Sequence, residues 1–280
     1  VIVDWRRYEP GIGLVPIPVL EYKQMAGRAG RPKYDRYGEA ILIAKSPNEK
    51  DFLFEEYVYA ETERIWSKLA NEEELRTHVL ASIATGLSTD VHSLMGFLEK
   101  TFYAYQIGST GLRDVVDKTI DFLKKEALVT RRGDELRPTR FGRRVSELYI
   151  DPVTAVILRD GLKKAENTGV VTDFAVLHLV CLTPDMEKLK VKRSEVEELV
   201  STVDEHFDEF LVPVPDFYWN PEGTENFFLA VKTAKLFMDW INEEPEEAIM
   251  ARFNVWPGDL VRYAELGEWL LYSAVEIGKL

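Results

Sequence analysis

The hydrophobic and polar positions divide the chain into a short first stretch of mixed strands and helix and a longer helical remainder. The apolar runs VIVDW and EAILIAK, the second after Gly38, predict two strands. Between them, a loop broken by glycine and proline leads to a helix predicted from Val19 to about Ala29. Strands and helices alternating at this spacing are typical of α/β structure, but this segment is too short to form a sheet alone. We expect residues 1–50 to be the end of a larger domain.

From about Asp51 the apolar residues recur three and four positions apart, which predicts helices. The pattern in LRTHVLASIATGLSTDVHSLMGFLEKTFYAY breaks at Thr85-Gly86, and a further helix is predicted over GLRDVVDKTIDFLKKEALV. Gly133-Asp134 then marks the turn of a hairpin in VTRRGDELRPT. Helices followed by a basic hairpin are the layout of a winged helix, which we assign to residues 51–144.

Beyond Asp151, helical patterns dominate, and we expect residues 145–280 to form a helical bundle. Asp151 is a candidate N-cap, and Ser194 with Glu197 fits a capping box. Asp259 is the predicted N-cap of the last helix. The predicted fold class is therefore mainly α with a small α/β part.

Composition adds limits on location and chemistry. The 280 residues are 46% hydrophobic and 30% charged, which is ordinary for a folded protein of two or three domains. There is no apolar run of about 18 residues and no charged-then-apolar leader, so we expect a cytoplasmic protein without a membrane span. Cys181 lies in the apolar run FAVLHLVCL and is expected to be a small buried side chain. The four histidines lack metal-ligand spacing, so we expect no metal site.

Charge is unevenly distributed along the chain. The net charge of −13 argues against a nucleic-acid coat protein, which should be basic. Residues 1–50 carry 9 Lys and Arg against 6 Asp and Glu, a net of +3, whereas residues 141–280 carry 14 against 26, a net of −12. The dense basic patch from Arg131 to Arg144 holds six arginines. Any anion-binding site must therefore be local.

The stretch EYKQMAGRAGRPKYD carries the first candidate site. On the predicted helix, Gln24, Arg28 and Arg31 fall on neighbouring turns of one face, and Pro32 stops the helix. Two guanidinium groups at this spacing can grip phosphate oxygens in a bidentate manner. The alternative is an arginine-rich helix end that satisfies its own carbonyl groups.

Two glycines in the same stretch, Gly27 and Gly30, leave room for a close approach of the backbone to a ligand. The complete string Q-x-x-G-R-x-G-R is more specific than an arginine pair alone. It favours the phosphate interpretation.

The last predicted helix, DLVRYAELGEWLLYSAVEIGKL, carries the second candidate site. At 100° per residue, an ordinary apolar stripe lies on one side, while Arg262 and Trp269 fall together on the other, with Glu265, Ser273 and Glu276. A tryptophan on a polar face is explained either by packing against a neighbouring helix or by stacking on an unpaired base, with arginine holding a phosphate. The pattern alone leaves both explanations open.

The string QMAGRAGRPKYDRYGEA resembles the sixth conserved motif of superfamily 2 helicases, in the form of the Ski-like branch. The resemblance implies that Gln24, Arg28 and Arg31 face the triphosphate of ATP bound between two RecA-like domains, beside Gly27 and Gly30. It makes Arg31 the arginine finger, which stabilises charge developing during phosphoryl transfer. The first 50 residues would then end the second RecA-like motor domain.

Later strings extend the resemblance over essentially the whole chain. SKLANEEELRTHVLASIATG, FLEKTFYAYQ, LYIDP and WPGDL are similar to segments of the archaeal HelQ/Hjm DNA helicases. In those proteins a long helix crosses the DNA channel and uses an arginine and a tryptophan as a ratchet, and Arg262 and Trp269 match these positions. The resemblance further implies translocation from 3′ to 5′ and a repair or recombination role at stalled forks. Two roles are open for the basic patch, contact with phosphates of the duplex ahead or bracing of the winged helix against its neighbours. We expect the first for Arg131 and Arg132 and the second for some of the other arginines.

The chain departs from the family pattern in lacking G-x-x-x-x-G-K-[ST] and an acidic metal-binding box, the Walker A and B motifs. We therefore expect the intact enzyme to use ATP and Mg²⁺. We expect this C-terminal part alone to bind neither of them and not to hydrolyse ATP. The expected partners are single-stranded and forked DNA and the remaining motor domain of the same chain. The expected protein is a monomer associated with the nucleoid.

Two rival functions stay open. A Ski-like RNA helicase would use the same stacking and phosphate contacts, because these do not distinguish DNA from RNA without a contact to the 2′-hydroxyl. A non-catalytic winged-helix scaffold would bury Trp269 and tolerate loss of the arginines. The complete motif string disfavours the scaffold.

Overall fold

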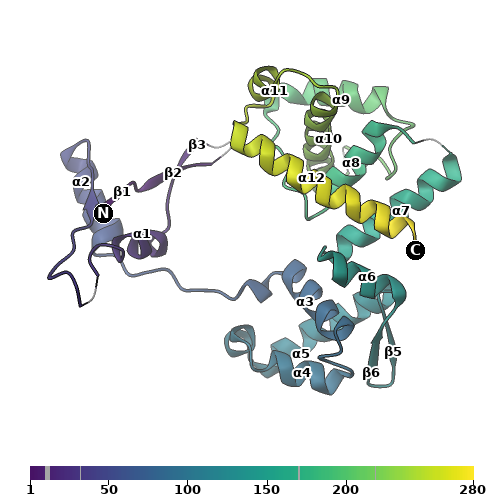
Figure 1. Ribbon diagram of the computed structural model, residues 1–280, viewed down its shortest axis with the longest axis horizontal. Coiled ribbons are helices and arrows are strands. Elements are labelled where there is room, and N and C mark those ends of the chain that lie inside the picture. Colours follow the sequence, from purple (N-terminus) through teal and green to yellow (C-terminus); the bar gives the residue numbers. More distant parts are fainter. Residues whose placement is uncertain (10–12, 32, 170, 218) are drawn as a thin grey trace. The chain divides into compact units, whose positions relative to one another are not determined.

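The computed structural model describes residues 1–9, 13–31, 33–169, 171–217 and 219–280. It contains two compact units, Val1–Ile65 and Trp66–Leu280 (Figure 1). Each unit has its own hydrophobic core. Among the described residues, no helix is long and apolar enough to cross a membrane.

The first unit combines short strands with helices. Its strands are β1 (Ile2–Val3), which pairs in parallel with β4 (Ile41–Leu42), and the antiparallel hairpin of β2 (Arg6–Glu9) and β3 (Gly13–Pro16). The hairpin occupies part of the stretch predicted as a loop, so that prediction is wrong there. Its helices are α1 (Val19–Ala26), α2 (Pro47–Leu53) and the π-helical turn Phe54–Val58.

The core of the first unit is small. Its buried members come from the beginning and the end of the segment: Val3, Ile17, Tyr22, Leu53 and Tyr57. The Tyr57 hydroxyl donates a hydrogen bond of 2.9 Å to the carbonyl oxygen of Ile17. This bond ties the end of the segment to the strand and helix at its beginning.

The second unit begins with the predicted winged helix. After a 3₁₀ turn at Lys68–Ala70, it contains α3 (Glu72–Ala84), α4 (Val91–Leu98), α5 (Phe102–Lys125), the wing strands β5 (Val129–Arg132) and β6 (Glu135–Pro138), and α6 (Arg140–Leu148). The break predicted at Thr85-Gly86 and the hairpin turn at Gly133 are both present. Gly108, with φ +74°, kinks α5.

Close backbone contact fixes α6 against the winged helix. A β-carbon on the buried Gly142 would collide with the carbonyl oxygen of Leu128. Thr139 caps α6 by accepting the Gly142 N–H at 2.9 Å, and its hydroxyl also donates to the carbonyl oxygen of Ala127 at 2.7 Å. Glycine is therefore required where α6 passes Leu128, in the connection between α5 and β5.

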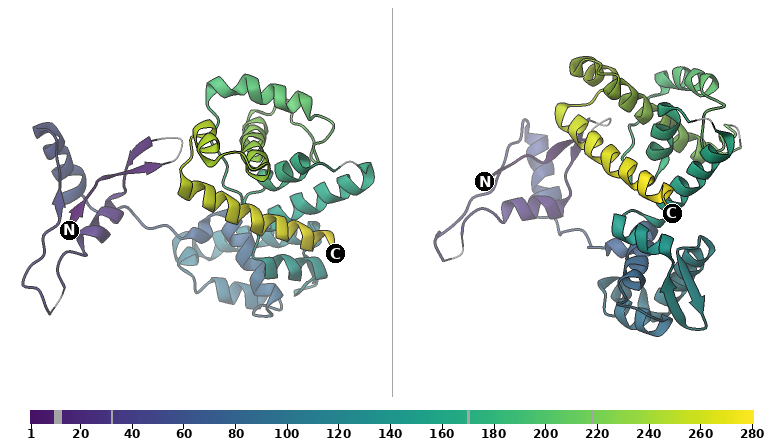
Figure 2. Two further views of the ribbon diagram at one scale, coloured as in Figure 1. Left: turned by 45° about the horizontal axis from the view of Figure 1, so that its top comes forward. Right: turned by 45° about the vertical axis from the view of Figure 1, so that its right-hand side comes forward.

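The helical bundle follows in the same unit. Its helices are α7 (Pro152–Thr168), α8 (Asp173–Leu182), α9 (Val196–Glu205), α10 (Pro221–Ile241), α11 (Glu246–Phe253) and α12 (Pro257–Gly278). Helix α10 packs against α8, α9 and α11, while α12 packs against α6, α7, α8 and α11 (Figure 2). The prediction of a mainly α chain with a winged helix and a bundle is confirmed.

Two predicted helix starts are shifted. Helix α9 begins at Val196 and has no side-chain cap hydrogen bond. The capping contact belongs to the preceding 3₁₀ turn Arg193–Glu195, where Glu195 accepts the backbone N–H of Lys192 at 2.7 Å. Helix α12 begins at Pro257, so Asp259 lies in its first turn and accepts the Trp256 N–H at 2.9 Å. Asp259 is thus not the N-cap residue, because proline occupies the first helical position ahead of it.

Candidate functional site

The arginine motif of the first unit lies at the end of α1. The helix ends at Ala26, earlier than predicted, and the N–H of Gly27 donates 2.9 Å to the carbonyl oxygen of Lys23. Gln24 stays in the last turn and is exposed, whereas Arg28 is exposed in the turn beyond the helix. The arginines therefore do not share a helix face with Gln24. Pro32, which was predicted to stop the helix, lies outside the described residues.

A pair of glycines closes the loop that begins with Arg31. Gly30 has φ +80°, and a β-carbon built on it would lie 3.2 Å from Cα of Gly38. A β-carbon on Gly38 would collide with the carbonyl group of Ala29. The two glycines therefore allow the ends of the loop to cross in close contact. Gly38 was not predicted as a site residue, because its role depends on this crossing.

Arg31 is held by its own loop. Its backbone N–H donates to Oδ2 of Asp35 at 2.8 Å, its Nε lies 3.3 Å from the same oxygen, and its guanidinium carbon is 5.5 Å from the Tyr34 ring centroid. The side chain remains 76% exposed. An exposed i,i+4 pair stabilises a fold little. Asp35 therefore orients Arg31 while leaving it accessible to an anionic ligand.

The second candidate pair lies on one flank of α12. Arg262 is exposed and forms an ion pair with Glu187. Trp269 is half-buried, packs against the core, and donates from Nε1 to the carbonyl oxygen of Leu148 at 3.2 Å. Ser273, predicted on the polar side, is buried and donates to the carbonyl oxygen of Trp269 at 2.9 Å. Trp269 thus lies at the border between the core and the surface.

Glu187, the partner of Arg262, is carried by a well-anchored segment. Lys188 donates from Nζ to the carbonyl oxygen of Thr183 at 2.7 Å, and the Leu189 N–H donates to the Thr233 hydroxyl at 3.0 Å. Burial lowers the pKa of the Lys188 ammonium group. The segment therefore presents the Glu187 carboxylate beside α12 from a fixed position.

The wing places its two candidate DNA-binding arginines differently. Neighbouring strand residues point to opposite faces, so Arg131 and Arg132 do not act side by side. Arg131 is half-buried and donates from Nε to the carbonyl oxygen of Gly133 at 3.0 Å. Arg132 is exposed and, with Thr130, Glu135 and Arg137, lines a hollow of about 240 Å³. Arg132 is the more accessible of the two.

Arg144 braces the winged helix against the bundle. Its guanidinium group lies 2.5 Å from Glu276 of α12 and 2.9 Å from Glu147 of its own helix. The hydrogen bonds that Arg144 donates to Glu276 and Glu147 raise the pKa of Arg144, and the bonds that Glu276 accepts from Lys279 and Arg144 lower the pKa of Glu276. The bracing role expected for part of the arginine patch therefore belongs to Arg144.

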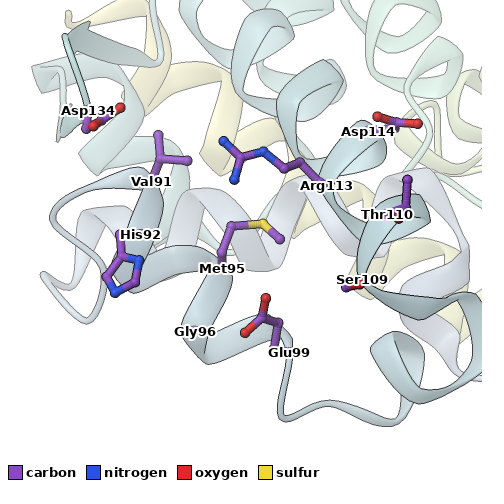
Figure 3. A pocket seen from close by; sticks show the side chains of 10 residues that line it. All are labelled: Val91, His92, Met95, Gly96, Glu99, Ser109, Thr110, Arg113, Asp114 and Asp134. Carbon is purple, nitrogen blue, oxygen red and sulfur yellow. The ribbon is translucent and has the colours of Figure 1, made fainter.

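A further pocket, of about 580 Å³, lies between α4 and α5 of the winged helix. Figure 3 shows the Arg113 side chain reaching from α5 toward α4, where Val91 and Met95 lie. Its polar lining is mixed, with Arg113 and His92 beside the carboxylates of Glu99, Asp114 and Asp134. This mixture does not select a ligand of one charge.

The buried titratable groups of the bundle are structural. His178 is fully buried, with the ring centroids of Phe210 and Phe227 at 4.6 and 4.5 Å, and burial lowers its pKa to about 3. Burial raises the pKa of the Cys181 thiol. Cys181 is the small buried side chain predicted. Within the described residues, no group of three or more His, Cys, Asp and Glu side chains is placed to hold a metal ion.

Two domain families match parts of the chain. A family described as a helix-turn-helix domain matches residues 38–130. A family described as archaeal helicase, domain 4, matches residues 174–280. The second match includes the whole of α12, with Arg262 and Trp269.

The chain is similar along its whole length to archaeal proteins named ATP-dependent DNA helicase Hel308. The identity is 44% to the protein of Methanocella arvoryzae, 39% to that of Thermococcus kodakarensis and 35% to that of Caldivirga maquilingensis. In each comparison all of this chain is covered, but only 38%, 24% and 38% of the respective relatives. The chain thus spans well under half the length of these relatives. It belongs to the archaeal Hel308 helicase family and corresponds to part of the length of these relatives.

Proposed function

We propose that this chain is the C-terminal portion of an ATP-dependent DNA helicase, supplying an arginine finger and a helix that holds single-stranded DNA. The predicted domains are residues 1–50 as the end of the second RecA-like domain, 51–144 as the winged helix and 145–280 as the ratchet bundle. Because the first compact unit runs to Ile65 and buries Leu53 and Tyr57 in its core, we place the first boundary near residue 65. The family membership and the accessible arginines support this proposal.

The ATP-facing residues are Gln24, Arg28 and Arg31, beside Gly27 and Gly30. The exposed amide and guanidinium groups are donors, which fits the phosphate oxygens of ATP. ATP bound with Mg²⁺ would supply the phosphoryl group whose transfer drives movement. Arg31, oriented by Asp35, neutralises charge that develops on the transferred group. Gln24 holds a phosphate oxygen or water, and Arg28 binds a neighbouring phosphate.

The DNA-holding residues are Arg262 and Trp269. The observation that carries this proposal is their placement on one flank of α12, with Arg262 exposed and Trp269 anchored through its indole N–H. Seven residues of helix separate them by about 10 Å. Trp269 stacks on an unpaired base, and Arg262 binds the backbone nearby. Alternate gripping and release, timed by ATP, moves the protein along the strand in the 3′ to 5′ direction.

The winged helix adds a contact to the DNA backbone. Arg132 on the open face of the wing, with Arg131 behind it, binds phosphates of the duplex ahead of the single strand. The substrate class is therefore forked DNA at stalled replication or during recombination. The enzyme acts as a monomer in the cytoplasm, associated with the nucleoid.

The test is the anisotropy of a fluorescent oligothymidylate titrated with the chain and with Trp269→Ala. Loss of one base stack is expected to weaken binding by roughly tenfold. Trp269→Phe should keep most of the affinity, and Trp240→Ala, which removes a partly exposed tryptophan of α10, should keep all of it. Equal binding by Trp269→Ala and the parent chain would remove the ratchet assignment. An RNA oligomer bound and unwound better than DNA would favour the RNA helicase.

We also propose that this chain alone does not hydrolyse ATP. Phosphate release should match the buffer blank, whereas the full-length helicase should lose most of its DNA-stimulated turnover in Arg31→Ala. Turnover that follows the purified 280-residue chain and disappears in Arg31→Ala would contradict this.

A further inference from the structure

Tyr149 has a backbone conformation that is unfavourable for its residue type. It follows α6 with φ 59° and ψ 31°, the left-handed region, and its N–H donates to the carbonyl oxygen of Ser146 at 3.2 Å. Helices often end in this conformation, but with glycine or asparagine, because a β-carbon is strained there. A large aromatic side chain at this position therefore needs an explanation other than helix termination.

The residues around Tyr149 are fixed, while its ring is not covered. Leu148 and Ile150 are buried on either side, and Asp151 is buried beyond them. Tyr149 itself is 71% exposed. By contrast Tyr105, another strongly exposed tyrosine of this unit, stacks on Phe102 with ring centroids 6.2 Å apart. The backbone of Tyr149 is held rigidly in a strained conformation that directs the ring into solvent.

The exposed Tyr149 follows the residue that anchors Trp269. The indole N–H of Trp269 is bonded to the carbonyl oxygen of Leu148, the residue directly before Tyr149. Consecutive Cα atoms are about 3.8 Å apart, so the Tyr149 backbone lies next to the carbonyl group that anchors the Trp269 indole. Trp269 lies on α12 and Tyr149 at the end of α6, two helices that pack together.

We infer that Tyr149 is a second base-stacking residue, which binds an unpaired nucleobase next to the one held by Trp269. This rests on the proposed function, since it extends the same strand path from α12 to the end of α6. An exposed aromatic ring on a fixed backbone offers a stacking surface that accepts any base and loses little conformational freedom on binding. The strained backbone is retained because it orients the ring.

Substitutions at Tyr149 can separate the ring from the backbone. Tyr149→Gly and Tyr149→Asn remove the ring and suit the left-handed conformation, so the melting temperature should stay the same or rise. Tyr149→Phe keeps the ring and the strain. In anisotropy titrations with oligothymidylate, Gly and Asn should weaken binding about fivefold or more, and Phe should bind like the parent. Tyr105→Ala is the control for loss of an exposed tyrosine and should bind normally.

The outcomes distinguish this inference from the proposed function. If the Gly and Asn variants bind like the parent while Trp269→Ala binds weakly, Tyr149 is not a stacking residue but the ratchet assignment stands. If neither position affects binding, both proposals fail. Weak binding by Tyr149→Gly together with an unchanged or higher melting temperature supports the inference. A merely structural role of Tyr149 would lower the melting temperature as well as the DNA affinity.

Discussion

The strongest structural prediction concerns the ion pair between Arg76 of α3 and Asp151 at the start of α7. Nε and Nη2 of Arg76 lie 2.6 and 2.7 Å from the two carboxylate oxygens, and the side chains are only 15% and 5% exposed. Asp151 also accepts the Val153 N–H at 2.7 Å, and its own N–H donates to Asp185 at 2.8 Å. This pair therefore joins the winged helix to the bundle beside the segment that anchors Trp269.

Removing one partner should destabilise the second unit strongly. Breaking a buried, bidentate pair costs about 3–5 kcal/mol, because the remaining charge is left without its partner. In Arg76→Ala the Asp151 carboxylate keeps its backbone donor, so we expect the lower end, about 3 kcal/mol. For a unit of this size that corresponds to a fall in melting temperature of about 6–12 °C.

The measurement is urea unfolding of Arg76→Ala, Asp151→Asn and the double variant, analysed as a double-mutant cycle. Asparagine keeps an acceptor for the helix cap, so the cycle isolates the charge pair, and we expect a coupling energy of about 2 kcal/mol or more. Arg113→Ala is the control, since Arg113 and Asp117 form an exposed pair at 3.8 Å that should contribute less than about 1 kcal/mol. If Arg76→Ala unfolds like this control and the coupling is near zero, the junction is not held by this pair.

Three further predictions follow from individual contacts. Glu187→Gln should bind oligothymidylate more tightly than the parent at low salt, because the carboxylate that competes with phosphate for Arg262 is gone; equal or weaker binding would exclude that competition. Gly38→Ala should lower the melting temperature of the first unit and abolish ATP turnover of the full-length enzyme, because the methyl group collides with Ala29; normal stability would contradict the loop closure. Burial raises the pKa of Asp185, so the native state keeps its proton to higher pH than the unfolded state, and stability falls as pH rises between the two pKa values. Asp185→Asn should flatten this fall in urea unfolding as the pH is raised above the ordinary range of an aspartate pKa, and an unchanged pH profile would refute it.

Much of the fold follows from local sequence patterns. The helices of the winged helix and of the bundle carry apolar stripes at helical spacing. Gly133 marks the turn of the wing hairpin, because the backbone there has φ +60°. Errors concentrated at helix ends. The predicted helix from Val19 stops at Ala26 because two glycines and the loop crossing at Gly38 favour a turn over another helical turn.

The candidate site was only partly predictable. Arg262 and Trp269 could be placed on one helix, but the partner of Trp269 is the carbonyl group of Leu148, 121 residues earlier. No local pattern indicates such a contact, nor the ion pair of Arg262 with Glu187. For Arg31 the partner Asp35 lies four residues away, a spacing visible in the sequence. Long-range contacts therefore decide how far each site residue is exposed.

The most direct test of the account is to locate where single-stranded DNA lies on the chain. An oligonucleotide containing iodouracil, irradiated in complex with the 280-residue chain, attaches covalently to aromatic residues that stack on its bases, and mass spectrometry identifies the peptides. The account predicts attachment to the α12 peptide that contains Trp269, reduced in Trp269→Ala. Attachment confined to the wing or to the first unit, with the Trp269 peptide unmodified, would contradict it.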